Sequence, residues 1–499
     1  AHVVFMSEYK LTVGLEIHAE LNTNSKMFCD SPNHPAGDAP NQFICPVCMA
    51  HPGTLPVINM AAVEHVVRVG LAIGGTINEY TQFDRKNYFY PDLPKGYQIS
   101  QYKHPIVSGG SITLKSGKVI RVTRVHLEED TGRLSHADAG TSLVDFNRAG
   151  VPLMELVTEP DISSAEEARE FAEELQLILR YVGASHARME MGEMRVEANI
   201  SVAPEGAPLG TKVEVKNINS FRSVDGAIAY EYNRHVAAIE AGSAIVQETR
   251  GWDEIKNLTY SQRIKEDAHD YRYFPEPDLP PLRMNVPGGI QVAEVEKQLP
   301  ELPRAKRERL MKEYGFDKTG ADTLVRDRAL ANYFEQADSE LQAWLTAEKL
   351  DDVAKERGKK LLKNYLLSDV VGLMTAQGKE WDHIPMTPEN YAEHIAMLDA
   401  DKITSRGAKD LLTELMTNGG DPSQIVSEKG LLQVSDNTLL VNVISEVKVS
   451  EASAFEQFKN GNDSTLQYLV GMTMKAVKAK GQSANPQKLQ ELWKQERAN

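Results

Sequence analysis

The sequence predicts an α+β protein, with an antiparallel sheet and flanking helices first and helical domains after it. Short runs through about residues 11–290 alternate apolar and polar side chains, as strands do. After Pro303 apolar residues recur at helical spacing, and the proline pair at 280–281 marks the change. Because successive strands lack regular intervening helices, we expect a largely antiparallel sheet.

The first part of the chain contains both strand and helix signals. Alternation is clearest in six runs, at 11–20, 118–130, 141–147, 151–158, 195–202 and 212–217. Helical spacing predicts helices over 59–73 and 163–182. The second helix has a serine cap at Ser163 or Ser164 and Gly183 after its end.

The second part is predicted to be helical. The expected helices are 304–314, 327–336, 341–367, 387–400 and 405–417. A Gly-Gly-Asp-Pro break at 419–422 precedes a last small helical unit. We therefore divide the chain into domains at 1–294, 295–408 and 409–499.

The charge is acidic overall but basic near the end. The net charge of −16 over 499 residues argues against bulk binding of polyanions and leaves room for a local basic surface. Residues 459–499 hold seven Lys and Arg against three acids, including Lys475, Lys478 and Lys480. Two explanations of this excess are equally good: a solvated helix end and a contact with RNA.

Composition also predicts the cellular compartment. The sequence contains no run of about 18 apolar residues, so it predicts no membrane span. The first residues also lack the pattern of a secretory signal. Three cysteines, two of them in a Cys-x-x-Cys, favour a reducing cytoplasm over a disulfide scaffold. We expect a cytoplasmic protein.

Several carboxylates lie on predicted strands. Strand alternation puts Glu16, His18 and Glu20 on one face. Further acids on strands are Glu128, Glu129, Glu155 and Glu197. Oxygen ligands of this kind suit Mg²⁺, which also binds substrate phosphates. The alternatives are exposed polar faces, or internal ion pairs with Arg121, Arg124 and Arg148.

The segment 84–101 combines four aromatic residues with Arg85, Lys86 and Lys95, two prolines and a glycine. It fits neither a core strand nor a surface helix, and its cations suit an anionic ligand. The alternative is a proline-stiffened edge loop. No phosphate-binding loop motif occurs, so ATP, if bound, would lie on the sheet.

Cys29, Cys45 and Cys48 have the spacing of a zinc knuckle with one ligand missing. Ser31 is a poor zinc ligand, so His34 or a non-protein ligand would complete the site. Buried reduced thiols are the competing interpretation.

Five segments together resemble one family closely. They are the residues Val-Gly-Leu-Glu-Ile-His at 13–18, the segment 84–101, His-Leu-Glu-Glu-Asp at 126–130, Asn-Arg at 147–148 with 152–159, and Asp-Tyr-Arg-Tyr-Phe-Pro-Glu-Pro-Asp at 270–278. The chain resembles the B subunits of bacterial aspartyl/glutamyl-tRNA amidotransferases, the GatCAB complexes, nearly from end to end.

The resemblance implies a fold and a reaction. The first domain would be a cradle related to glutamine synthetase. ATP and Mg²⁺ would activate the side-chain carboxylate of misacylated Glu-tRNA(Gln) or Asp-tRNA(Asn), and ammonia would convert it to the amide. The implied metal and catalytic residues are Glu16, His18, Glu129 and Glu155, with Glu128 and Glu197 as further metal ligands.

The resemblance also implies contacts with the substrates. Arg85, Lys86 and Lys95 would contact phosphate or line the route of ammonia. Lys216, Asn217 and Asn219 are further candidates for contacting nucleotide or substrate.

The resemblance implies a heterotrimer as well. A separate amidase, the A subunit, would release ammonia from glutamine, and a small C subunit would brace the pair. The helical region and tail would bind the tRNA body through Lys475, Lys478 and Lys480. One departure concerns zinc, because many zinc-bearing members have a cysteine where this chain has Ser31. The alternatives are a noncatalytic tRNA-binding scaffold and a stand-alone small-molecule ligase.

Overall fold

The computed structural model describes residues 9–35, 39–138, 140–264, 271–378, 381–433 and 437–498. The chain forms two compact units, Ala1–Lys306 and Arg307–Asn499. The three-domain division at 294 and 408 stays a prediction.

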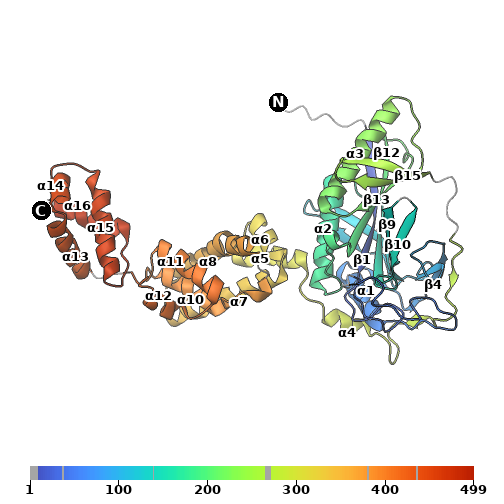
Figure 1. Ribbon diagram of the computed structural model, residues 1–499, viewed down its shortest axis with the longest axis horizontal. Coiled ribbons are helices and arrows are strands. Elements are labelled where there is room, and N and C mark those ends of the chain that lie inside the picture. Colours follow the sequence, from blue (N-terminus) through green and yellow to red (C-terminus); the bar gives the residue numbers. More distant parts are fainter. Residues whose placement is uncertain are drawn as a thin grey trace. The chain divides into compact units, whose positions relative to one another are not determined.

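The first unit is built on a mixed ten-stranded sheet (Figure 1), in the order β15-β14-β13-β12-β1-β11-β8-β6-β2, with β7 paired to β8. The longest strands, β1, β8 and β12, lie in the interior of the sheet, and the edge strand β2 has two residues. Among the described strands of this sheet, only β13 and β14 pair in parallel. The prediction of a largely antiparallel α+β fold is therefore confirmed, and a relationship to glutamine synthetase stays a prediction. The strands are β1 (Tyr9–Glu20), β2 (Thr76–Ile77), β6 (Val107–Ser108), β7 (Ser111–Thr113), β8 (Val119–Glu129), β11 (Pro152–Thr158), β12 (Met194–Pro204), β13 (Val213–Ile218), β14 (Glu248–Asp253) and β15 (Leu258–Ile264).

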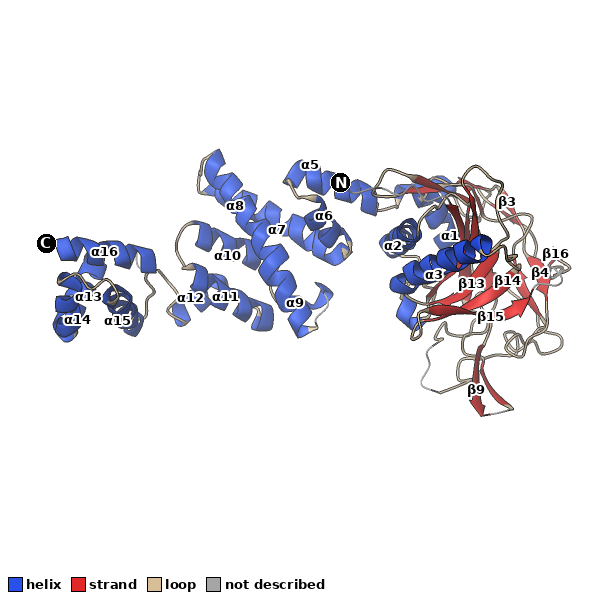
Figure 2. Cartoon of the chain, turned by 90° about the horizontal axis from the view of Figure 1, so that it is seen from above, coloured by secondary structure: helices blue, strands red, loops and turns tan. Residues whose placement is uncertain are grey.

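Three helices pack against the sheet (Figure 2): α1 (Met60–Ala72), α2 (Ala165–Tyr181) and α3 (Phe221–Glu240). Both helices predicted for this part are present, and Ser164 caps α2 by accepting a hydrogen bond from Glu167 N–H. The prediction missed α3, because Glu231 and His235 interrupt its apolar spacing while being buried themselves.

A β-bulge in β8 determines which of its side chains face the helices. The register with β11 shifts between Val157 and Thr158, so that one extra residue of β8 is inserted near Thr123. Ile120 and Val122 before the bulge, and Val125 and Leu127 after it, all join the apolar core. Uninterrupted alternation would put Val119 on the same face as Val125 and Leu127, but because of the bulge Val119 lies on the opposite face and is exposed.

Smaller sheets and one further helix complete the first unit. β4 (Asp84–Asn87) pairs with both β5 (Tyr97–Ser100) and β16 (Phe274–Pro275), and β3 (Tyr80–Thr81) pairs with β17 (Leu282–Arg283). The hairpin of β9 (Arg133–Asp138) and β10 (Thr141–Asp145) projects away from the main sheet (Figure 2). Helix α4 (Val292–Lys297) packs against α1.

Helices account for the secondary structure described in the second unit. They include α5 (Pro303–Tyr314), which begins in the first unit, α6 (Lys318–Val325), α7 (Arg328–Ala347), α8 (Asp352–Tyr365), α9 (Val371–Gln377), α10 (Pro388–Asp399), α11 (Ser405–Asn418) and α12 (Pro422–Glu428). The predicted helix over 341–367 was wrong. The chain turns at Lys349, whose φ is +54°, and Asp351 caps a new helix.

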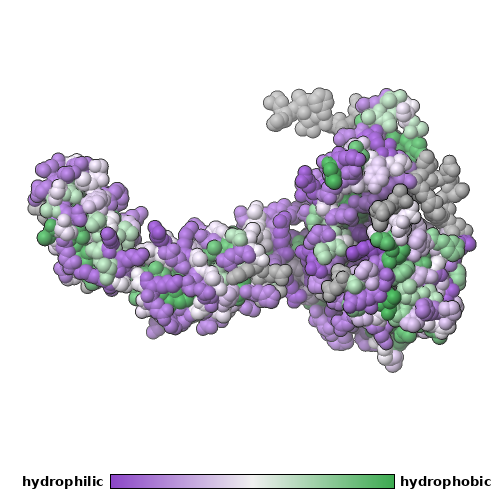
Figure 3. Space-filling model, viewed as in Figure 1, coloured by the Kyte–Doolittle hydropathy of each residue, from purple (hydrophilic) through white to green (hydrophobic). Residues whose placement is uncertain are grey.

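The last four helices share a separate apolar core that includes Leu440, Leu469 and the fully buried Trp493. They are α13 (Asn437–Ser450), α14 (Ala452–Lys459), α15 (Thr465–Ala479) and α16 (Pro486–Ala498). Hydrophilic residues dominate the visible surface of the second unit (Figure 3). Within the described ranges, no helix is both long and apolar enough to cross a membrane.

Candidate active site

The centre of the site is set by strand register. His18 on β1 lies opposite Glu155 on β11, and Glu155 lies opposite His126 on β8. Directly paired residues project from the same face of a sheet, so three adjacent strands contribute one polar row. Glu16 and Glu128 lie two positions from His18 and His126 on this face.

These five residues, which we call the acid–histidine cluster, are in mutual contact. His18 Nε2 lies 3.4 Å from a Glu155 oxygen, 3.7 Å from Glu16 and 3.8 Å from Glu128. His126 Nε2 lies 3.5 Å from Glu155 and 3.7 Å from Glu128. Two overlapping triads, one with Glu16, His18 and Glu155 and one with His126, Glu128 and Glu155, bring their ligand atoms within 4.8 Å.

The electrostatics of the cluster reflect buried acids held together. Burial, together with the nearby charges of Glu155 and Glu197, raises the pKa of Glu16 to about 7. Burial acts against the charged form of His18, but the hydrogen bond and charge of Glu155 outweigh it and raise the His18 pKa to about 9. Burial likewise opposes ionisation of Glu155, yet His126, His18 and Lys86 bring its pKa below the usual value. The cluster therefore attracts positive charge.

Lys86 supplies part of that charge. Burial disfavours its ammonium, but Glu128, Tyr273 and Glu155 raise its pKa above the ordinary value. Its Nζ also lies 5.3 Å from the centre of the Tyr271 ring. Of the arginines weighed as internal partners, Arg124 approaches Glu155 at 3.8 Å, whereas Arg121 pairs with Asp161 and Arg148 with Asp130.

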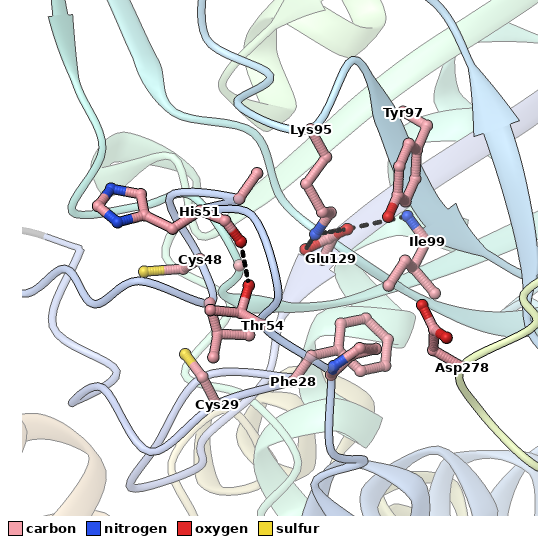
Figure 4. Close-up of a pocket in the computed structure, with 14 residues that line it drawn as sticks. Phe28, Cys29, Cys48, His51, Thr54, Lys95, Tyr97, Ile99, Glu129 and Asp278 are labelled. Atoms are coloured by element: carbon pink, nitrogen blue, oxygen red, sulfur yellow. Dashed lines mark hydrogen bonds and ion pairs between the residues drawn. The ribbon is translucent and has the colours of Figure 1, made fainter.

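Glu129 does not join the acid–histidine cluster. Its carboxylate accepts hydrogen bonds from Lys95 Nζ at 2.5 Å and from Ile99 N–H at 2.9 Å. Figure 4 shows this pair in a pocket whose lining also includes Cys29 and Cys48. Strand alternation explains the separation, because Glu128 and Glu129 project from opposite faces of β8.

Glu197 and Glu20 lie beside the cluster with partners of their own. Glu197 is opposite Glu16 across β1 and β12 and pairs with Lys216 at 2.7 Å. Burial, together with the charge of Asp130, raises the pKa of Glu20 to about 7. Asn217 is exposed at the end of β13 with a left-handed φ of +65°. Lys216 is thus nearer the cluster than Asn217.

Arg85 is held by carboxylates. It forms two hydrogen bonds with Glu276, at 2.7 and 2.9 Å, and approaches Asp278 at 3.3 Å. Its guanidinium also lies 4.2 Å from the centre of the Tyr97 ring. These contacts fasten the 84–101 segment to 274–278, while Asp270 lies outside the described residues. Arg85 therefore has a bracing position and Lys86 the position facing the acids.

The three cysteines meet as their spacing predicts. Cys29, Cys45 and Cys48 place their sulfur atoms within 4.8 Å of one another. Lys26, which is 0% exposed, points its Nζ at Cys48 Sγ from 3.8 Å. A hydrogen bond from Cys29 lowers the pKa of Cys48 to about 4, and the Cys45 N–H and Lys26 also lower it. Ser31 Oγ lies 3.9 Å from Cys48 Sγ, whereas His34 packs against Phe43.

The predicted tail cations differ in their surroundings. All three lie on or just after α15 and are exposed. Lys480 pairs with Glu446 at 2.8 Å, so its charge is partly offset. Within the described chain, Lys475 and Lys478 have no such ion pair.

His126 was missed as a site residue. Strand alternation already places it on the face of Glu128, and the pairing with β11 brings it opposite Glu155, which in turn lies opposite His18. A signal was present in the sequence, since His126 and Glu128 have the same acid-and-imidazole spacing as Glu16 and His18.

Comparison with known proteins agrees with this arrangement. The model of the GatB/GatE catalytic domain matches residues 11–287, and the model of the GatB domain matches residues 348–496. The first range contains the acid–histidine cluster and the three cysteines, and the second contains the tail cations.

Curated relatives match almost the whole chain. The aspartyl/glutamyl-tRNA(Asn/Gln) amidotransferase B subunits of Thermoanaerobacter pseudethanolicus and Caldicellulosiruptor saccharolyticus are each 43% identical, over 98% of this chain and 99% of the relative. The corresponding protein of a Synechococcus strain is 44% identical, over 98% of this chain and 97% of its own length. On this evidence of sequence and domain content, the chain belongs to the family of aspartyl/glutamyl-tRNA amidotransferase B subunits.

Proposed function

We propose that this chain catalyses the ATP-dependent amidation of Glu-tRNA(Gln), Asp-tRNA(Asn) or both, as the B component of a cytoplasmic heterotrimer. The observation that carries the proposal is the acid–histidine cluster, which gathers three carboxylates, two imidazoles and the nearby Lys86 on one face of the sheet. Buried acids at this density need a compensating cation, and a phosphate-bearing ligand would be held through it.

The donor set fits Mg²⁺. Glu16, Glu128 and Glu155 offer hard oxygen ligands, and His18 and His126 complete the two triads. When bound, Mg²⁺ would offset negative charge on the phosphates during transfer. Lys86 would contact the same phosphates from the rim, because it already faces Glu128 and Glu155. Lys216, paired with Glu197, would contribute a second positive charge.

The proposed reaction has two steps. A side-chain carboxylate is a poor electrophile, so its oxygen first attacks the γ-phosphorus of ATP and releases ADP, giving an acyl phosphate. Ammonia then attacks the carbonyl carbon, the carbon–oxygen bond to phosphate breaks, and the nitrogen loses a proton to leave the amide. The cluster positions the phosphates in the first step.

Ammonia must reach the acyl phosphate from outside this chain. The sequence shows no glutaminase or amidase signature, so we assign glutamine hydrolysis to a partner amidase, the A subunit, braced by a small C subunit. The pocket containing Lys95 and Glu129 is our candidate for the route (Figure 4). The Lys95–Glu129 pair lines it with groups that hydrogen-bond ammonia.

The second unit is proposed to hold the tRNA. Lys475 and Lys478 would meet phosphates of the folded RNA, which proteins recognise largely through shape and backbone. Lys480 would contribute less, because Glu446 is its partner. The three cysteines would hold structural Zn²⁺, which needs a fourth ligand besides them.

Glu155→Gln tests the catalytic assignment against a noncatalytic scaffold. The substitution keeps the shape but removes the charge that both imidazoles face. We expect amidation with ATP and free ammonia to fall by more than ~100-fold while tRNA binding is unchanged. Glu159→Gln, which alters a half-buried acid just beyond β11, is the matched control. Normal turnover by the Glu155 variant would favour the scaffold.

A further inference from the structure

Beside the acid–histidine cluster lies a stacked pair of aromatic rings. The rings of Tyr102 and Tyr273 have centroids 4.4 Å apart and planes inclined by 7°. Tyr102 is 49% exposed, so its ring is backed by Tyr273 and open to solvent elsewhere. Tyr102 N–H donates to Asp84 Oδ2 at 2.9 Å, which fixes the backbone that carries this ring.

Two connections place the pair next to the proposed phosphate site. Ser100, two residues before Tyr102, donates a hydrogen bond to Glu128 at 2.9 Å. On the other ring, burial raises the pKa of Tyr273 to about 12, and its phenol also senses Lys86, Glu128 and Glu155. The rings therefore border the face that would hold a triphosphate.

A nucleotide bound at the proposed phosphate site also has a flat base that needs a place to bind. An adenosine whose phosphates bind at Lys86 and the cluster must place its base nearby, and stacking on an aromatic ring holds any base without reading its edges. The Tyr102 ring has a packed neighbour on one side, so little ordering is needed before a base stacks on it.

We propose that Tyr102, supported by Tyr273, is a stacking platform for an adenine base. The inference rests on the proposed function, which brings two adenosines to this face: ATP, and the 3′-terminal adenosine of the tRNA. Both offer the same chemistry, so the experiment distinguishes them.

The test measures ligand binding by the full-length chain with Tyr102→Ala, Tyr102→Leu and Tyr102→Phe. In the ATP arm, we expect Ala and Leu to weaken MgATP binding by about 10-fold, with Phe near wild type and magnesium tripolyphosphate unaffected. In the tRNA arm, removal of the terminal adenosine should weaken binding to the wild type but not to the Ala variant. A loss confined to one arm identifies the source of the base.

The control is Tyr260→Ala, a tyrosine of the edge strand β15 that is 43% exposed. It should bind every ligand as the wild type does. Unchanged binding of both MgATP and tRNA by Tyr102→Ala would overturn the platform and leave the proposed function intact. Equal losses for MgATP and tripolyphosphate would also overturn it, since the base would then be irrelevant. A wild-type chain that binds neither MgATP nor tRNA would overturn both.

Discussion

Glu128 and Glu129 are consecutive in sequence and meet different partners. Glu128 accepts a hydrogen bond from Ser100 and faces His126, whereas Glu129 pairs with Lys95. Each is almost completely buried, so each requires its own compensating charge. We assigned both to Mg²⁺ from sequence, and the structure brings only Glu128 to the acid–histidine cluster.

This separation gives a prediction for Glu129→Gln. The substitution removes the charge that Lys95 faces and should disturb the proposed ammonia route more than the phosphate site. We expect glutamine-driven amidation to fall by about 10-fold or more, equivalent to ~1.4 kcal/mol, with a smaller fall under saturating ammonium salt. Steady-state rates with each nitrogen source provide the measurement. Equal losses of rate with glutamine and with ammonium salt would indicate that Glu129 acts in the chemical step and not in the delivery of ammonia.

The sequence predicted most residues of the site, and the reasons for its failures are local. Glu16, His18 and Glu155 could be identified because strand alternation and a close family resemblance agreed on them. His126 was not assigned, although alternation places it on the same face as Glu128, and its position opposite Glu155 emerges only from the pairing of β8 with β11. The carboxylates that hold Arg85 come from residues about 190 positions away, beyond the reach of any local pattern.

At the level of elements, α1 packs closely against β6 through Gly70. A Cβ added there would lie 2.5 Å from Val107 Cγ2 and 2.7 Å from Ile77 Cδ1. Gly70→Ala should therefore destabilise the first unit by about 1–3 kcal/mol, measured by hydrogen exchange of α1. Gly471→Ala is the control, because a Cβ on Gly471 in α15 meets no atom within 4 Å. That variant should be neutral or stabilised by up to ~1 kcal/mol.

The packing of α3 on β14 and β15 contains a buried ionic network with a pH dependence. Burial alone would raise the pKa of Glu231, but hydrogen bonds from His235, Arg234 and Thr259 outweigh it and lower the pKa to about 2. A carboxyl whose pKa is lowered by folding stabilises the fold above its unfolded value of 4.5, and that contribution is lost as pH falls toward 2.

Glu231→Gln should accordingly destabilise α3 at neutral pH, by up to about 3 kcal/mol, and reduce the loss of stability between pH 4.5 and 2. Hydrogen exchange of peptides from β14 and β15 across this pH range is the measurement. An acid transition as steep as that of the wild type would show that other carboxyls control it. Asp253→Asn, on a half-exposed acid at the end of β14, is a suitable comparison.

Element prediction succeeded where periodicity was strong and failed where polar residues were buried or the chain turned without a proline. The long central strands and α2 follow their patterns closely. α3 was missed because charged residues occupy its buried face. The break between α7 and α8 was missed because Lys349, unlike glycine, gives no warning of a left-handed turn.

For the whole molecule, the proposed function requires an acidic chain to bind an acidic RNA. With a net charge of −16, attraction must come from local groups, and Lys475 and Lys478 are the candidates in the tail. Reversing both to Glu should weaken tRNA binding and make the dependence of log K on log[salt] shallower by about 1–2. Lys480→Ala should have a smaller effect, since Glu446 already neutralises that charge. If the wild type and the double variant show the same slope of log K against log[salt], the tail is not part of the RNA interface.

The bulge in β8 changes which alternate residues of the strand face the apolar core. Before the bulge, even-numbered residues such as Val122 face the apolar core. After it, odd-numbered residues such as Val125 do. Deleting Thr123 would remove the extra residue, so that Ile120, Val122, Val125 and Leu127 would alternate without interruption and His126 and Glu128 would keep their present face. The loss of this one residue should thus relieve the local bend in β8 while the apolar core and the site face stay where they are, so such a protein should remain folded.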